Sequence, residues 1–328
     1  MPKRRTKGKS RTESRVYLPV MSRTILGTGI FNLDTIVVRE YPEGPSRQRV
    51  FNERCVLEEI GGTCGNVMTM LSHLGERVFP IARFDDSPEG LRLTGDLLRY
   101  GCDCRYVSNT PDGGTTTLRC VHRQDKDGNH ILRSRIGSPG GSRFPSRKFL
   151  RGRDEAPAFL DSLGFTPYVF FFDDPAAGHR VLARGLRGKG TLVYFEPSHM
   201  ESRTDLECVA SSDIVKFSNQ NIPDTDFTDA FGDKLFIQTL GADGLRFNLR
   251  GEGWVTLPPV RCEHVADWEG AGDWTTSMLI HGLCARGILS VDAMTRGNIT
   301  EVLQNAQEVA SRSVAYLGSK GIIHAGKI

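Results

Sequence analysis

Residues 267–273 read Asp-Trp-Glu-Gly-Ala-Gly-Asp, and they stand directly before an apolar helical run, Trp274–Leu283. Two glycines separated by a small residue let the backbone approach a phosphate closely at the start of a helix. The first N–H groups of a helix have no partner within it, and the helix dipole favours an anion at that end. The stretch therefore predicts an anion site with Asp273 beside it, where the carboxylate could accept a proton from an attacking hydroxyl. On this stretch alone, an aspartate that only caps its own helix is an equal alternative.

Short apolar runs alternate with helical patterns through most of the chain. The expected strands are Ile25–Phe31, Val169–Phe172, Leu192–Phe195, Ile214–Phe217 and Leu235–Leu240. The expected helices are Asn66–Leu74, Gly178–Leu186, and residues 274–286 and 299–317. Because the apolar runs lack the alternation of a one-sided sheet, we expect strands that are covered on both faces. Alternating strands and helices predict a largely parallel sheet with right-handed crossovers.

One region departs from this rhythm. Within residues 103–137, two β-like pieces, Thr115–His122 and His130–Ile136, are joined by residues 124–129, whose Asp and Gly residues predict a hairpin turn. Together with the polar segment 33–58, these pieces predict a small β-sheet that covers one end of the main sheet. Residues 137–157 are rich in Gly, Ser, Pro and Arg, and they predict an exposed loop.

The composition is that of an ordinary globular protein, with 38% of the 328 residues hydrophobic and 25% charged. Residues 1–20 are basic and poor in apolar groups, so we expect a disordered tail there; an arm that binds nucleic acid is the alternative. The net charge is only +3, and no apolar run approaches the length of a membrane span, so neither nucleic acid nor a membrane is an expected partner. The eight cysteines show no C-x-x-C spacing, which favours a reducing cytoplasm.

Three further segments place polar groups where ligands bind in α/β proteins. Residues 29–34 follow the first expected strand and end in the carboxylate of Asp34, at the carboxyl edge of the sheet. Residues 61–66 open a helix with two glycines and end in Asn66, so backbone N–H groups and an amide could meet a polyol there. Residues 239–244 follow another expected strand and could hold nucleotide phosphates.

Taken in order, these motifs resemble the PfkB family of carbohydrate kinases, which have the ribokinase-like fold. The resemblance runs from about Ile25 to Gly326 and also includes residues 84–90 and 213–218. It implies a three-layer α/β/α kinase domain over residues 21–328. Parts of 33–58 and 103–137 would form a small β-sheet lid that excludes water from the site. The implied activity is transfer of the γ-phosphoryl group of ATP to a hydroxyl of a sugar or sugar derivative.

The resemblance also implies a role for individual residues. Asp273 would be the catalytic base, and the anion hole would be formed by Gly270, Ala271 and Gly272. The acceptor would be held by Asn32, Asp34, Gly61, Gly62, Asn66 and Asp173. ATP would lie along Lys216, Ser218, Thr239, Gly241 and Gly244, and the helix from Ile299 would flank its adenine. The implied cofactors are ATP and Mg²⁺, and the loop of Asp267 would bind a monovalent cation, K⁺.

Two departures from the family pattern bear on metal binding and activity. Trp268 and Glu269 follow Asp267, where the family has two threonines. The family's Asn-x-x-Glu motif, which helps to order magnesium and phosphate, falls at residues 218–221, and here its last residue is Asn221. These changes leave open a protein that binds a sugar or nucleotide but has lost catalysis. The retained Asp273 argues for an active enzyme, because a pure binder needs no base at that position.

The sequence does not name the acceptor, so a nucleoside kinase of the same fold is a further alternative. Such an enzyme needs an apolar or aromatic wall for the base, and Phe31, Phe84 and Phe171 are candidates, although such residues are more often core. The exposed face of the lid is a candidate surface for pairing with a second copy of the chain.

Overall fold

The computed structural model describes residues 23–40, 52–125, 128–137 and 155–328. The expected tail, residues 1–20, and most of the expected loop, residues 138–154, lie outside the described residues. The strands are β1 (Thr24–Thr28), β2 (Asn32–Glu40), β3 (Asn52–Gly61), β4 (Arg77–Phe84), β5 (Val107–Asn109), β6 (Thr116–Asp125), β7 (Gly128–Gly137), β8 (Val169–Phe172), β9 (Leu192–Phe195), β10 (Ile214–Ser218), β11 (Leu235–Thr239), β12 (Leu245–Leu249) and β13 (Trp254–Leu257). The α-helices are α1 (Thr63–His73), α2 (Pro88–Arg99), α4 (Glu155–Ser162), α5 (Ala177–Arg187), α6 (Arg203–Ala210), α7 (Ala271–Arg286), α8 (Arg296–Ser313) and α9 (Gly321–His324). Short 3₁₀ turns are η1 (Cys104–Tyr106), η2 (Asp226–Ala230), η3 (Gly241–Asp243) and η4 (Val291–Ala293).

The larger sheet has nine strands in the order β13-β12-β11-β10-β9-β8-β1-β4-β5. Every pair from β11 to β5 is parallel, and only β12 runs antiparallel to its two neighbours. The prediction of a largely parallel sheet is therefore confirmed. The carboxyl ends of the parallel strands meet at one edge, which is where ligands bind in open α/β sheets.

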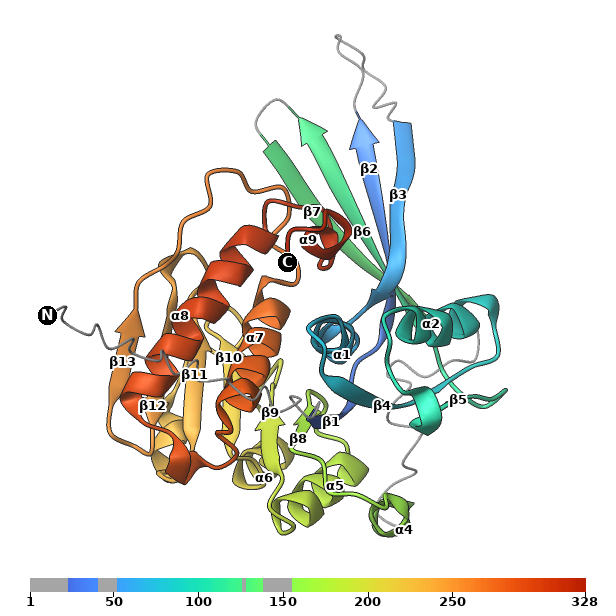
Figure 1. Cartoon of the computed structure of the whole chain (residues 1–328). Coiled ribbons are helices and arrows are strands. Elements are labelled where there is room, and N and C mark those ends of the chain that lie inside the picture. Colours follow the sequence, from blue (N-terminus) through green and yellow to red (C-terminus); the bar gives the residue numbers. More distant parts are fainter. Residues whose placement is uncertain (1–22, 41–51, 126–127, 138–154) are drawn as a thin grey trace, which may run out of the picture.

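The two faces of this sheet are covered by different helices, as Figure 1 shows. Along β8, Val169 and Phe171 pack in one core cluster with residues of α1, α2, α7 and α8, whereas Phe170 and Phe172 pack in another with residues of α5 and α6. Such alternation, in strands whose residues are apolar throughout, is typical of a sheet buried on both faces. The predicted three-layer α/β/α architecture is confirmed.

A second, four-stranded sheet has the order β3-β2-β6-β7 and stands at one end of the main sheet (Figure 1). We call it the lid sheet. The pairs β2–β3 and β6–β7 are antiparallel, and the central pair β2–β6 is parallel. Asp125 pairs with Gly128, so the predicted hairpin is confirmed, although its tip lies outside the described residues. Strand β2 follows β1 closely and β3 leads directly into α1, so both carry the chain between the lid sheet and the carboxyl edge of the main sheet.

Some boundaries differ from the sequence-based expectations. Residues 155–162 form helix α4, although they were expected in part to continue an exposed loop, because Ala156 is buried against the α5 side of the sheet. Residues 107–109 join the main sheet as β5 and do not belong to the lid sheet. Helix α8 ends at Ser313, short of the expected residue 317. Among the described residues, no helix combines the length and the apolar character needed to cross a membrane.

Candidate active site

Helix α7 begins at the carboxyl edge of the main sheet with the glycine-rich stretch of residues 270–272. Gly270 is its N-cap residue, in the left-handed conformation with φ of 80°. A Cβ atom at Gly270 would lie 2.4 Å from Cβ of Ser319, so only glycine fits between the helix and that residue. No side chain caps α7, and Asp273 is its third residue. The alternative that Asp273 only caps its own helix is therefore wrong.

Asp273 lies within hydrogen-bond distance of a residue far away in the sequence. The side-chain amide of Asn66, on α1, donates to Oδ2 of Asp273 at 2.6 Å. Burial and the nearby charge of Glu196 raise the pKa of Asp273 to about 6, against the opposing effects of the Asn66 hydrogen bond and of Lys216 and Lys320. Asp273 as a whole residue is half-buried. A carboxylate that titrates near neutral pH has the properties of a general base.

A buried ion pair lies beneath the first turn of α7. Lys216, on β10, pairs with Glu196, which directly follows β9, and Thr276 of α7 donates to the second oxygen of the same carboxylate at 2.6 Å. The Lys216 ammonium lies 3.7 Å from the position that a Cβ atom would take at Gly272. Positive charge is thereby placed beside the start of α7, where the helix dipole also favours an anion.

The acceptor-side residues predicted from the sequence meet where the lid sheet joins the main domain. Asn32 pairs with Gly61 across β2 and β3, and Asp34 is two residues further along β2. A Cβ atom at Gly61 would lie 1.7 Å from Oδ2 of Asp34, so the carboxylate rests directly on the glycine. Gly62 has φ of 79° and is the N-cap residue of α1, the helix that carries Asn66. The structure thus brings these five predicted residues to one junction.

Asp173 has a different environment from the one expected of a residue that faces a sugar. It is buried after β8, and its two oxygens accept backbone hydrogen bonds from Ile30 at 2.8 Å and Cys64 at 2.9 Å. Burial and the charge of Asp174 raise its pKa above the usual aspartate range. These bonds tie the end of β8 to the loop after β1 and to the first turn of α1. A contact between Asp173 and the acceptor stays a prediction.

The residues predicted to lie along ATP follow two neighbouring strands. Ser218 and Thr239 are register partners at the carboxyl ends of β10 and β11. Gly241 and Gly244 have φ of 62° and 93°, conformations that favour glycine, and they bound the exposed turn η3. Asn221, which replaces the expected glutamate, is an exposed residue in the turn after β10.

Asp267 is almost fully buried and holds two loops together. Its oxygens accept backbone hydrogen bonds from Glu269 and from Gly318, each at 2.9 Å. Trp268, between them in the first loop, is 56% exposed. Within the part of the chain that the structure describes, no group of three or more His, Cys, Asp or Glu side chains is arranged to hold a metal by itself.

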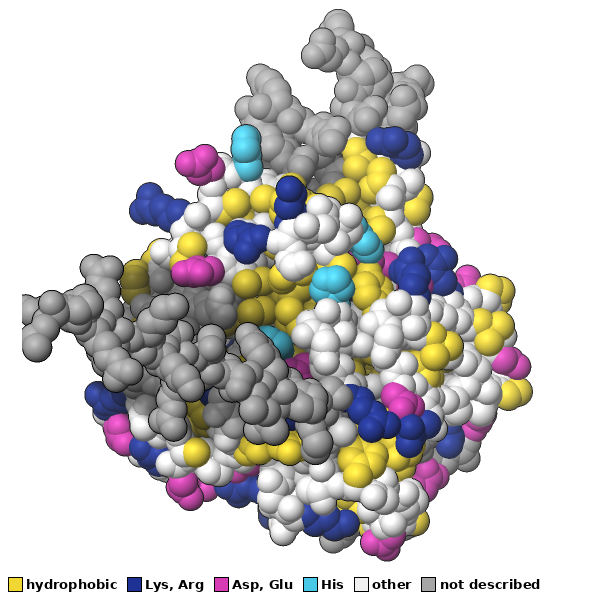
Figure 2. Space-filling model, in the orientation of Figure 1, with side chains coloured by type: hydrophobic (Ala, Val, Ile, Leu, Met, Phe, Trp, Pro, Cys, Tyr) yellow, Lys and Arg dark blue, Asp and Glu magenta, His cyan; other side chains and the backbone are white. Residues whose placement is uncertain are grey.

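The aromatic candidates for a base-binding wall belong to the core. Phe31, Phe84 and Phe171 are fully buried, and the rings of Phe31 and Phe84 pack edge to face with centroids 5.7 Å apart. Figure 2 shows hydrophobic side chains where the lid sheet meets the main domain, so an apolar surface is available near the junction.

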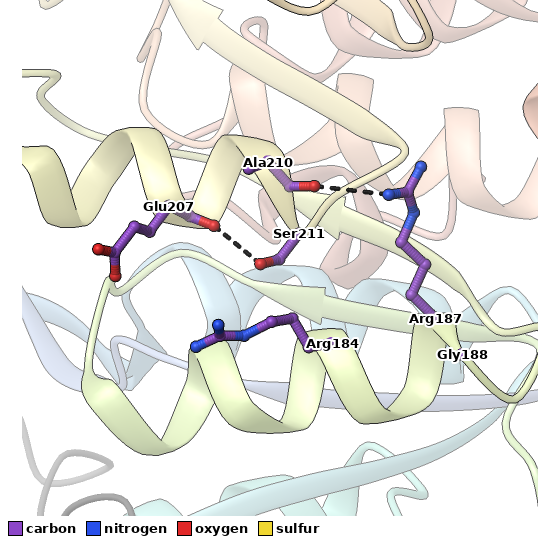
Figure 3. A pocket seen from close by; sticks show the side chains of 6 residues that line it. All are labelled: Arg184, Arg187, Gly188, Glu207, Ala210 and Ser211. Carbon is purple, nitrogen blue, oxygen red and sulfur yellow. Dashed lines mark hydrogen bonds between the residues drawn. The ribbon is translucent and has the colours of Figure 1, made fainter.

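An open hollow on the main domain is lined by none of these residues. It is bordered by α5 and α6 and lined by Arg184, Arg187, Gly188, Glu207, Ala210 and Ser211 (Figure 3). The Arg187 guanidinium already pairs with Asp213 at 2.8 Å and Asp233 at 3.2 Å, and it donates to the backbone carbonyl of Ala210. Its charge is thus satisfied within the protein, and the hollow does not belong to the candidate site.

Sequence reasoning missed three residues that the structure brings to the site, namely Glu196, Ser319 and Lys320. Glu196 directly follows a buried strand, which is the same signal that singled out Asp34 and Asp173. Ser319 and Lys320 stand between two glycines after the last long helix, and no simple pattern distinguishes them from a surface turn. Their contacts with Asn66 appear only in the folded protein.

Known structures share this arrangement of sheets and helices. Arabidopsis thaliana ribokinase, solved with ribose and ATP, matches with a TM-score of 0.64 and 16% identity, over 94% of this chain and 100% of that chain. A fructokinase double mutant from Vibrio cholerae O395, solved with fructose, ADP and potassium ion, matches with a TM-score of 0.65 and 18% identity, over 91% and 94%. Aminoimidazole riboside kinase from Salmonella enterica, solved with its riboside and an ATP analog, matches with a TM-score of 0.60 and 21% identity, over 90% and 95%.

Sequence comparison adds nothing to these matches, because no protein-family model and no curated protein matches the chain. At identities of 16–21%, the similarity establishes the fold, which is the ribokinase-like fold. Activity has to be argued from the residues of the site itself.

Proposed function

We propose that this protein is an ATP-dependent carbohydrate kinase that phosphorylates a hydroxyl of a sugar or sugar derivative, with Asp273 as the catalytic base. One observation carries the proposal. The carboxylate of Asp273 lies in the first turn of α7, directly after the glycines of the anion site, and its pKa is raised to about 6. A helix start that binds anions and a base that titrates near neutral pH are the two groups that phosphoryl transfer to an alcohol requires.

In the proposed reaction, the acceptor hydroxyl gives its proton to Asp273 as its oxygen forms a bond to the γ-phosphorus of ATP. The bond between that phosphorus and the β–γ bridging oxygen breaks, and ADP leaves with the bridging oxygen. Negative charge on the transferred group is stabilised by N–H groups at the start of α7, residues 270–272, and by the Lys216 ammonium beside Gly272.

The two substrates approach Asp273 from different sides. Asn32, Asp34, Gly61, Gly62 and Asn66 hold the acceptor at the junction with the lid sheet, where the Asp34 carboxylate accepts hydrogen bonds from two hydroxyls. The nucleotide lies across the ends of β10 and β11, along the residues Ser218, Thr239, Gly241 and Gly244. The lid sheet excludes water, which would otherwise compete with the acceptor for the phosphoryl group.

Two cations complete the proposal. Mg²⁺ is usually held by one or two carboxylates together with substrate phosphates and water, and it neutralises phosphate charge during transfer. Glu196 is the carboxylate whose charge acts on Asp273, but its two oxygens are already engaged by Lys216 and Thr276, so we propose that Mg²⁺ would be held mainly through the substrate phosphates and water. K⁺ is proposed for the loop of Asp267. The fructokinase neighbour was solved with potassium ion, which supports this part of the proposal.

Two alternatives on the same fold are separated from this proposal by one assay. The first alternative, a nucleoside kinase, loses its three aromatic candidates for a base-binding wall. Phe31, Phe84 and Phe171 are fully buried and offer no surface to a base. The second alternative, a sensor without catalysis, is suggested by the departures from the family pattern at Asn221, Trp268 and Glu269. This alternative does not explain why an aspartate is kept at position 273. ATP consumption over a panel of sugars and nucleosides identifies the acceptor class, and absence of turnover with every acceptor would support the sensor.

The role of Asp273 is tested by the Asp273→Asn variant with the acceptor found in that panel. We expect a fall in kcat of about 100- to 10,000-fold, because the base is lost while shape is kept. ATP affinity should change little. Turnover near the wild-type rate would refute the assignment. The Asp161→Asn variant, in an exposed position of α4, is the matched control and should retain full activity.

A further inference from the structure

Asn66, the residue that donates to the base, is itself held by two residues near the end of the chain. Its side-chain oxygen accepts hydrogen bonds from Ser319 Oγ at 2.9 Å and from Lys320 Nζ at 2.6 Å. Both contacts are buried, and Lys320 is completely inaccessible to solvent. A lysine ammonium can only donate, so the atom that faces it must be the amide oxygen. The amide nitrogen of Asn66 is then directed to Asp273.

A fully buried ammonium needs a negative partner, and the lid sheet provides it. Glu59, on β3, is 2% exposed, and its Oε1 lies 3.7 Å from Lys320 Nζ. Its other oxygen contacts His324 Nε2 at 2.9 Å and accepts a hydrogen bond from the Tyr100 hydroxyl at 3.1 Å. Burial alone would raise the pKa of Glu59, but Lys320, His324 and Tyr100 reverse the effect, and its pKa lies below the usual range. Glu59 and Lys320 therefore stand as a charged pair.

The segment that carries Lys320 also contacts the start of α7 and the underside of the lid sheet. Gly318 donates to Asp267, and the Ser319 carbonyl accepts a hydrogen bond from the Trp274 indole at 2.8 Å. A Cβ atom at Gly318 would lie 2.7 Å from the Leu57 side chain of β3. The position of Lys320 is consequently fixed from two sides, by the helix of the base and by the lid sheet.

We propose that Lys320, held by Glu59 of the lid sheet, is a positioning residue that orients the Asn66 amide and so fixes the orientation and the ionisation of Asp273. Lys320 has no contact with Asp273 itself and acts through Asn66 and through its charge. The inference rests on the proposed function for the catalytic role of Asp273, but its decisive measurement does not need turnover. A purely structural ion pair would affect stability and leave the ionisation of Asp273 unchanged.

The groups that act on the ionisation of Asp273 come from four elements. Glu196 follows β9, Lys216 lies on β10, Asn66 lies on α1, and Lys320 precedes α9. The test changes only the last of these. Lys320→Met removes the ammonium and keeps the length of the side chain. This variant leaves the buried Glu59 with only His324 and Tyr100 as partners, which could destabilise the fold. The double variant Glu59→Gln/Lys320→Met removes both charges and is therefore the safeguard against misfolding.

The decisive measurement is a carboxyl ¹³C NMR titration of the full chain, in which the Asp273 signal is identified by its absence from Asp273→Asn. In wild type we expect a midpoint of about 6. In Lys320→Met the midpoint should rise by about one pH unit, because a nearby positive charge and an oriented amide donor are lost. In the double variant, where the opposite charge of Glu59 is lost as well, a smaller rise should remain from the lost orientation of the amide donor. The exposed Lys189→Met control should titrate as wild type. An unchanged midpoint in the folded double variant would overturn the proposal, whatever its activity.

Kinetics with the identified acceptor give a second readout. Loss of orientation should lower kcat by about 10- to 100-fold and leave KM for ATP within about threefold, because the nucleotide site is not altered. A kcat within twofold of wild type in the double variant would also overturn the proposal. If wild type turns over no acceptor but the midpoint still rises, the proposed function fails and the positioning role of Lys320 stands.

Discussion

The base of the proposed reaction should lower the stability of the protein that carries it. Asp273 has a pKa of about 6 in the folded protein, compared with about 3.8 for an ordinary aspartate. Each unit of difference corresponds to about 1.4 kcal/mol, so ionised Asp273 makes folding less favourable by about 3 kcal/mol at neutral pH. Asp273→Asn removes this cost and keeps a side-chain oxygen that can accept the Asn66 hydrogen bond. The variant that loses turnover should therefore be the more stable protein.

The sign of the pH dependence follows from the direction of the shift. Below the unfolded pKa the carboxyl is protonated in both states, and it has no effect on folding through ionisation. As the pH rises from about 4 to about 6, the unfolded chain loses its proton first and wild type loses stability. Asparagine does not titrate. The stability advantage of Asp273→Asn should be about 1.5 kcal/mol at pH 5 and about 3 kcal/mol at pH 8.

Urea denaturation of the two proteins between pH 5 and pH 8, followed by tryptophan fluorescence and circular dichroism, measures this difference. Asp161→Asn, at an exposed position on α4, is the control, and its stability should differ from that of wild type by less than about 0.5 kcal/mol at every pH. The reasoning is refuted if Asp273→Asn is less stable than wild type at pH 8. It is also refuted if the difference between the two proteins does not grow with pH.

Three further predictions concern activity and binding. With the pKa of Asp273 at about 6, kcat/KM should be halved near pH 6 and about tenfold lower at pH 5 than on its plateau; a rate that stays flat down to pH 5 would exclude Asp273 as the base. Asp34→Ala should weaken acceptor binding at least tenfold, since charge-assisted hydrogen bonds contribute about 1.5–3 kcal/mol each, and leave an ATP analogue unaffected by calorimetry; equal weakening of both would indicate misfolding. Activity should rise when potassium replaces a large inert cation at constant ionic strength, and a flat response would count against a monovalent site near Asp267.

Elements made of uninterrupted apolar residues could be predicted from the sequence almost to the residue. Strands β8 and β9 begin and end as expected, because four buried residues in each are bounded by polar or turn-forming neighbours. Helix α7 begins three residues earlier than its apolar run, since the glycines belong to its first turn and cap. Helix α4 escaped notice because a short segment among Gly, Ser and Arg residues gives a weak periodic signal.

Some residues of the candidate site could likewise be predicted from local sequence, and others could not. Asp273, Asn66 and Asp34 each stand next to glycines or strand ends, so local sequence alone draws attention to them. Lys320 carries no such mark, because a lysine is normally a surface residue and its burial depends on Glu59, far away in the chain. Charged side chains that are buried through distant partners are therefore the part of a site that a single sequence conceals.

The contacts around Asn66 also bear on how the protein is made. Asn66 meets Asp273 across 207 residues and Lys320 across 254, and His324 meets Glu59 across 265. A ribosome adds roughly 5–20 residues each second, so the first half of the sheet waits many seconds for the residues that complete the site. During that interval Glu59 has no cation to oppose its burial, and Asn66 has nothing to fix its amide. The nascent chain can form much of its sheet before these contacts exist, and the Asn66 amide is fixed beside Asp273 only when residues 318–324 dock.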